Sequence, residues 1–123
     1  MSADWPQLQR LALEEIEATL AELPTPLRGR AKQLPVTLER VPNAGLVADG
    51  IAPDTLGLFT GAEFAEEDHV PQPPQIILFL ENLWDFAEQN EDIFLDEVHT
   101  TYLHELGHYL GLDEDDLSER GLE

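Results

Sequence analysis

The chain has 123 residues, 42% of them hydrophobic, so it is long enough to bury one core but too short for a second. It contains no cysteine, which excludes disulfides, thiolate catalysis and thiolate metal ligands. Its formal net charge is −20, from 26 acidic and 6 basic residues, and such a surface repels phosphate backbones and anionic lipids. We therefore expect a single domain spanning residues 1–123 that binds neither nucleic acid nor membrane.

The same composition predicts a cytoplasmic protein. The first twenty residues have no basic region and no long apolar run, so they do not resemble a signal peptide. No stretch of the sequence approaches the length of a membrane span. A monomer and a homodimer are equally compatible with these features.

The first predicted element is a helix. Asp4 is a candidate N-cap with Pro6 in the first turn, and leucine and isoleucine recur at helical spacing until Pro24 ends the pattern. The following segment, TPLRGRAKQL, predicts one short basic turn. We interpret its cations as a solvated face rather than a binding patch; they are Arg28, Arg30 and Lys32.

Three strands are predicted in the middle of the chain. PVTLERV (35–41) alternates in hydropathy, and TLGLFTG (55–61) resembles a short strand with glycine bends. QIILFLE (75–81) is nearly continuously apolar, which is typical of a central, buried strand. The acidic, proline-rich segment at 62–74 is interpreted as a connector, with the rim of a cleft as the alternative. NLWDFAEQN (82–90) then predicts a short helix opened by Asn82.

The last long element, residues 91–112, predicts an amphipathic helix that carries HELGH. With His104 at zero on a helical wheel, His108 falls at about 40° and Glu105 near 100°, whereas the main apolar stripe lies between about 120° and 240°. The two histidines therefore share a face away from that stripe. This weakens the interpretation of buried core histidines and leaves a metal site or a solvated polar face.

The chemistry of zinc explains this spacing and favours the metal site. Imidazoles at positions i and i+4 can both point at one ion, each nitrogen about 2.0–2.1 Å away. Glu105 lies beside the first histidine, where a carboxylate can accept a proton from a water on the metal and pass it to a leaving amine. Gly111 follows three residues after His108 and can end the helix with a left-handed turn.

A third ligand is required, and the run DEDD directly after the turn supplies candidates. Glu114, six residues past His108, is the predicted ligand, with Asp113 and Asp115 as competitors. Asp113 also has the position of an N-cap for a final short helix, which leaves Glu114 freer to bind metal.

These residues resemble a known family. HELGHYLGLDE is similar to the HExxHxxGxxD/H signature of zincin metallopeptidases, and DTLGLF, IILF and TTYLHELGHYLGL resemble segments of the bacterial mini-zincins. The likeness covers roughly the last seventy residues. It implies an α+β, minimal zincin-like fold with an N-terminal helix, a small mixed β-sheet and a C-terminal active-site helix.

The resemblance also implies roles for individual residues. His104 and His108 would bind Zn²⁺ and Glu105 would be the catalytic base, while Glu114 stands where the family has an aspartate. The only methionine is Met1, so no Met-turn can follow the motif. Too few residues follow His108 for a separate helix that carries a glutamate ligand, which leaves a minimal zincin.

The leading functional hypothesis is a zinc-dependent metallopeptidase acting on a peptide or protein of unknown sequence. The alternative is a catalytically inactive zincin-like binding or regulatory protein, and Glu105 discriminates because only the enzyme needs it. Proteolysis also requires an edge strand that holds an extended peptide and a donor for the oxyanion. Candidate donors are Tyr109, His69, His99 and Arg120, although the wheel position of His99 favours a half-buried structural role.

Overall fold

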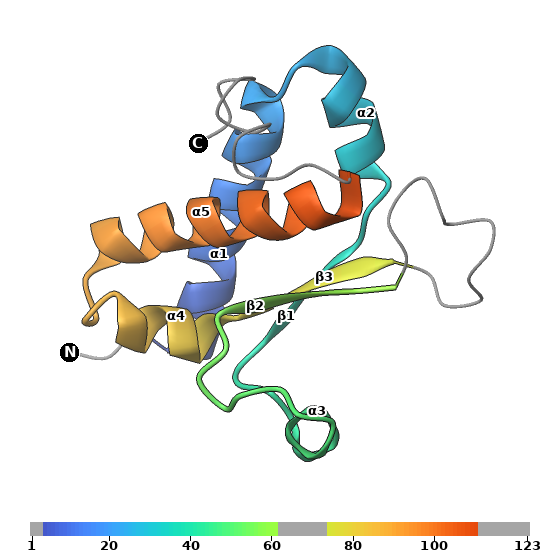
Figure 1. The fold of residues 1–123 in the computed structure, drawn as a ribbon. Coiled ribbons are helices and arrows are strands. Elements are labelled where there is room, and N and C mark those ends of the chain that lie inside the picture. The colour runs from blue at the N-terminus through green and yellow to red at the C-terminus, as the bar shows by residue number, and fades with distance from the viewer. Residues whose placement is uncertain (1–3, 62–73, 111–123) are drawn as a thin grey trace.

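The computed structural model describes residues 4–61 and 74–110, and within them it has the predicted α+β architecture. The helices are α1 (Trp5–Glu22), α2 (Thr25–Lys32), α3 (Ala44–Ala48), α4 (Leu80–Phe86) and α5 (Glu91–Leu110). The strands are β1 (Val36–Glu39), β2 (Gly57–Thr60) and β3 (Gln75–Phe79). Helices α1, α2 and α5 lie on one side of the sheet, and α3 lies on the other (Figure 1).

The sheet has the order β1-β3-β2, so the prediction that β3 is central is confirmed. Strand β1 pairs with β3 in parallel, and β2 pairs with it in antiparallel register, placing Gly57 opposite Leu78 and Phe59 opposite Ile76. Among the described strands β2 therefore forms an edge, on the side away from β1. Mixed pairing follows from the connections, because the link from β1 to β2 reverses the chain and β3 then runs back between them.

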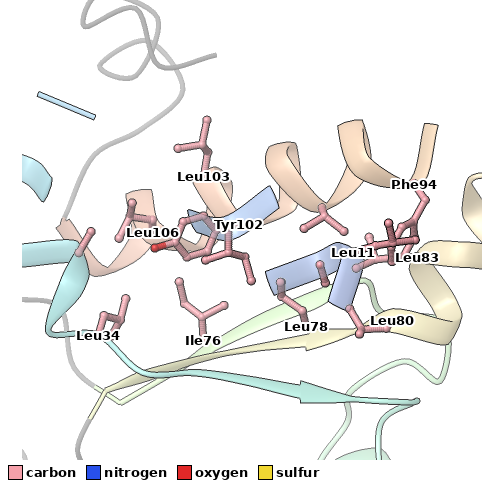
Figure 2. Close-up of a cluster of buried hydrophobic side chains, with 14 of the residues drawn as sticks. Leu11, Leu34, Ile76, Leu78, Leu80, Leu83, Phe94, Tyr102, Leu103 and Leu106 are labelled. Atoms are coloured by element: carbon pink, nitrogen blue, oxygen red, sulfur yellow. The ribbon is translucent and has the colours of Figure 1, made fainter. Parts of the chain in front are cut away.

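The main core lies between α5, α1 and the sheet. Ile76 and Leu78 point from β3 toward α5, where Tyr102 and Leu106 meet them (Figure 2). These side chains are at most 2% exposed. Phe79 is fully buried but lies outside this cluster, because alternation along the strand turns its side chain to the opposite face of the sheet.

Helix α1 begins as the sequence predicts. The side chain of Asp4 accepts a hydrogen bond of 2.9 Å from the backbone N–H of Gln7, and Pro6 occupies the first turn. At the end of α1, the prediction that Arg28 belongs to a solvated face is wrong. This side chain is half-buried and donates to the carbonyls of Ala21 and Leu23, so it satisfies acceptors at the helix terminus instead of facing only solvent.

Two further details of the middle segment differ from the sequence prediction. Helix α4 starts at Leu80, so Asn82 does not open it; its side-chain amide instead donates to the carbonyls of Pro53 and Thr55. The short helix α3 was not predicted. Asn43 caps it by accepting from the N–H of Leu46 at 2.8 Å, which is a signal present in the sequence.

Candidate metal centre

Helix α5 positions the histidines. It begins after Asn90, whose side chain accepts a 3.0 Å hydrogen bond from the N–H of Ile93, and it continues without interruption through Leu110. Regular helical geometry places residues i and i+4 on one face. His104 and His108 are accordingly both exposed, with ring centroids 4.6 Å apart and planes inclined at 60°.

Glu105 lies beside this pair but differs from it in burial. Its side chain is 10% exposed, whereas that of His108 is 52% exposed. The carboxylate Oε2 of Glu105 lies 3.6 Å from Nδ1 of His108, which is longer than a hydrogen bond. Candidate ligand atoms of His104, Glu105 and His108 all fall within 4.8 Å of one another.

This group of donors fits a zinc ion in its chemistry. Imidazole and carboxylate groups are ligand types that zinc accepts, and the two histidines are accessible to an ion from solvent. Within residues 4–61 and 74–110, Glu105 is the only carboxylate grouped with the two histidines. The structure therefore brings together three of the residues singled out in the sequence.

Comparison with known protein families also supports a metal-binding protein of this kind. The family model of the zincin-like metallopeptidases matches residues 31–122, which is 92 of the 123 residues and includes the whole HELGH segment. The chain belongs to the zincin-like metallopeptidase family. The match begins inside α2 and leaves α1 outside, and it is longer than the resemblance in the last seventy residues. No curated protein matches the chain.

The remaining ligand expected of a zincin-like site falls in a part of the chain that the structure does not describe. Gly111, Asp113, Glu114 and Asp115 all lie outside the described residues. The family match includes them, but it does not distinguish which carboxylate binds metal. Glu114 therefore stays a prediction.

Of the candidate oxyanion donors of this zincin-like site, two lie within the described residues and two lie outside them. Tyr109 is 2% exposed, and its ring lies 5.9 Å from that of Phe59 in β2, so it contributes to packing. His99 contacts Thr19 of α1 through its Nδ1 atom at 2.8 Å, which agrees with the predicted half-buried role. His69 and Arg120 lie outside the described residues.

Helix α5 runs alongside the edge strand β2. Gly57 of β2 lies against Thr101, one helical turn before Glu105, and Phe59 contacts Tyr109 beyond it. This contact was not predicted from the sequence, although the glycine in DTLGLF was a visible signal of it. None of the described helices is long and apolar enough to cross a bilayer, and the cytoplasmic location stays a prediction.

Proposed function

We propose that this protein is a zinc-dependent metallopeptidase that hydrolyses peptide bonds, with His104 and His108 as metal ligands and Glu105 as the catalytic base. The observation that carries the proposal is the cluster on α5, where a buried carboxylate lies with two exposed imidazoles within 4.8 Å. Zinc bound by such residues supplies a Lewis acid that polarises a carbonyl and makes water ionise near neutral pH.

The burial of Glu105 suits the role of a base. A carboxylate with few competing waters interacts more strongly with a proton donor placed beside it. In this proposal Glu105 takes a proton from the attacking water and later delivers it to the leaving amine. The exposed histidines, in contrast, carry no packing role that metal binding would disturb.

Strand β2 supports a peptide substrate in particular. The N–H of Phe79 donates to the carbonyl of Leu56, so in this antiparallel register Leu56, Leu58 and Thr60 direct their main-chain groups at β3. The intervening residues Gly57 and Phe59 direct theirs to the other edge of β2, with which no described strand pairs; we call it the open edge. An extended peptide can pair with those groups as an added strand.

Glu114 completes the ligand set in this proposal, which leaves a fourth position for water, as a catalytic zinc site requires. Its support is the sequence register, in which a glycine and then a carboxylate follow His108 at six residues' distance. The family match, which extends through residue 122, covers this segment.

The first experiment measures zinc content and peptide cleavage of the zinc-loaded chain and of Glu105→Gln. We expect the variant to keep its zinc while its rate falls by a factor of roughly 100 to 10,000, the usual effect of losing a general base. Glu97→Gln is the matched control, because this carboxylate lies two turns before His104 on the same side of α5. It should leave the rate unchanged.

Two results would contradict the proposal at different steps. An intact chain that binds no zinc at neutral pH has no metal site. A zinc-loaded chain that cleaves no member of a diverse peptide library is instead a zincin-like binding or regulatory protein.

The third ligand is tested by zinc affinity. Glu114→Ala should weaken binding far more than Asp113→Ala or Asp115→Ala, and Glu114→Asp should retain binding because a carboxylate remains. If Asp113 is an N-cap, Asp113→Ala should instead lower the free energy of unfolding by about 0.5–2 kcal/mol. Equal zinc affinity in Glu114→Ala and the unmutated chain would exclude Glu114.

A further inference from the structure

The contact between Gly57 and α5 is closer than any side chain would allow. A Cβ atom added at Gly57 would lie 2.6 Å from Cγ2 of Thr101 and 3.2 Å from Cδ2 of Leu78. The first distance is shorter than any ordinary carbon contact. Thr101 is only 9% exposed, and its branched side chain on a helix has few rotamers available, so it has little room to yield. Even alanine at position 57 would therefore displace β2 from α5.

The contact also lies beside the candidate metal centre. Thr101 precedes Glu105 by one helical turn, and the second contact of β2 with α5, from Phe59 to Tyr109, lies one turn beyond Glu105. These two contacts are separated by about 12 Å along the helix, with Glu105 midway between them. Strand β2 runs beneath α5 along this stretch (Figure 1).

The chain leading into β2 is held independently. Asn82 donates from one amide nitrogen to the carbonyls of Pro53 at 2.8 Å and Thr55 at 2.9 Å. The carbonyl of Leu56 accepts a bond from the N–H of Phe79 at 3.0 Å. The strand is thus fixed to the sheet at its start, and its approach to α5 is a defined part of the fold.

We propose that Gly57 is a positioning residue: because it has no side chain, the open edge of β2 lies close enough to α5 for a peptide paired with that edge to reach the histidine pair. The proposal rests on the proposed zinc peptidase function and adds the residue that couples peptide binding to the metal. Gly57 contributes its main-chain N–H and C=O to the open edge, and its lack of a Cβ allows the short separation between β2 and α5.

The test uses binding, so that it does not depend on turnover. The probes are acetohydroxamic acid, which reaches only the metal, and an alanine tetrapeptide ending in a hydroxamate, which can also pair with β2. Dissociation constants are measured calorimetrically with the zinc-loaded chain, with Gly57→Ala, with Thr101→Ser and with the double variant. Gly29→Ala is the matched control, because a Cβ at that position meets nothing within 4 Å.

Joining two binding groups raises affinity by roughly 100-fold or more, and this gain disappears when geometry prevents simultaneous contact. We expect the peptide hydroxamate to have that advantage in the unmutated chain and in Gly29→Ala. In Gly57→Ala the advantage should fall below about tenfold, with affinity for zinc and acetohydroxamic acid unchanged. Thr101→Ser removes the clashing methyl and should restore most of the advantage in the double variant.

The outcomes separate this proposal from the function on which it rests. A full peptide advantage in Gly57→Ala, or no recovery in the double variant, overturns the role of Gly57. An unmutated chain that binds acetohydroxamic acid but gains nothing from the peptide also overturns it, while leaving the metal site intact. An unmutated chain without zinc or hydroxamate affinity refutes the proposed function itself, before any variant is compared.

Discussion

The two sides of α5 differ in burial. The side that faces α1 and the sheet carries Val98, Tyr102 and Leu106, each at most 2% exposed. The opposite side carries His104 and His108, both exposed. Glu105 lies at the boundary, buried but within reach of His108. Packing of the first side fixes the position of the helix and leaves the two imidazoles of the second side exposed to solvent.

The largest expected difference between the two sides is in the free energy of unfolding that a substitution removes. Leu106→Ala should lower the free energy of unfolding by about 2–5 kcal/mol, because it leaves a cavity in the core. His108→Ala, measured in the metal-free protein, should change it by less than about 0.5 kcal/mol, as surface substitutions do. Urea unfolding in the presence of a chelator measures both. A comparable loss in His108→Ala would mean that the histidine side also stabilises the fold.

Tyr102, on the buried side of α5, should make the stability of the fold depend on alkaline pH. Burial raises the pKa of Tyr102 from 10.0 to about 12, and its hydroxyl has no hydrogen-bond partner among the described residues. Above pH 10 the unfolded chain releases this proton while the folded chain keeps it, so stability should fall between pH 10 and 12 and level off above. Two pKa units correspond to about 3 kcal/mol.

Tyr102→Phe should remove this alkaline loss and should be at least as stable as the unmutated chain at neutral pH, because it removes a buried hydroxyl that bonds to none of the described residues. Unfolding curves of both chains at pH 8 and pH 12 test this. An equal alkaline loss in the variant would assign it to other groups.

The helical periodicity of α5 was enough to predict which residues share a side. The wheel separated His104 and His108 from Tyr102 and Leu106 because a regular helix turns by a constant angle, and the structure has the same division. The near-continuous apolar run likewise predicted the central strand β3. Both are local patterns, in which neighbours along the chain carry the information.

The features that the sequence did not reveal depend on contacts between distant segments. Glu105 is buried although the wheel placed it beside the polar face, because other parts of the fold cover that side of α5. Asn82 resembles a helix cap, but its amide holds a loop that comes almost thirty residues earlier. The fit of Gly57 against Thr101 joins residues more than forty positions apart. No periodicity encodes such contacts.

Zinc should stabilise the fold only by binding to the side of α5 that carries His104 and His108. If the folded chain alone binds the ion, zinc at 100 times its dissociation constant adds about 2.7 kcal/mol to the free energy of unfolding. His104→Ala should abolish this increment. The increment should also disappear as pH falls and protons displace the metal from the imidazoles. Melting temperatures with zinc and with a chelator measure it, and an increment that persists in His104→Ala would place the ion elsewhere.

The smallest expected effect concerns His99, on the α1 side of the helix. Oγ1 of Thr19 lies 2.8 Å from the carbonyl of Glu15 and 2.8 Å from Nδ1 of His99. A hydroxyl has one proton and the carbonyl can only accept, so Thr19 donates to Glu15 and accepts from His99. His99 must therefore carry a proton on Nδ1, which nitrogen-15 NMR of the imidazole can detect.

Thr19→Val should lower the free energy of unfolding by about 1 kcal/mol because it leaves that N–H unpaired, and Thr19→Ser should lower it less. Neither variant should change zinc affinity. An unprotonated Nδ1 would contradict the assignment, whereas weaker zinc binding in Thr19→Val would show that the two sides of α5 are coupled.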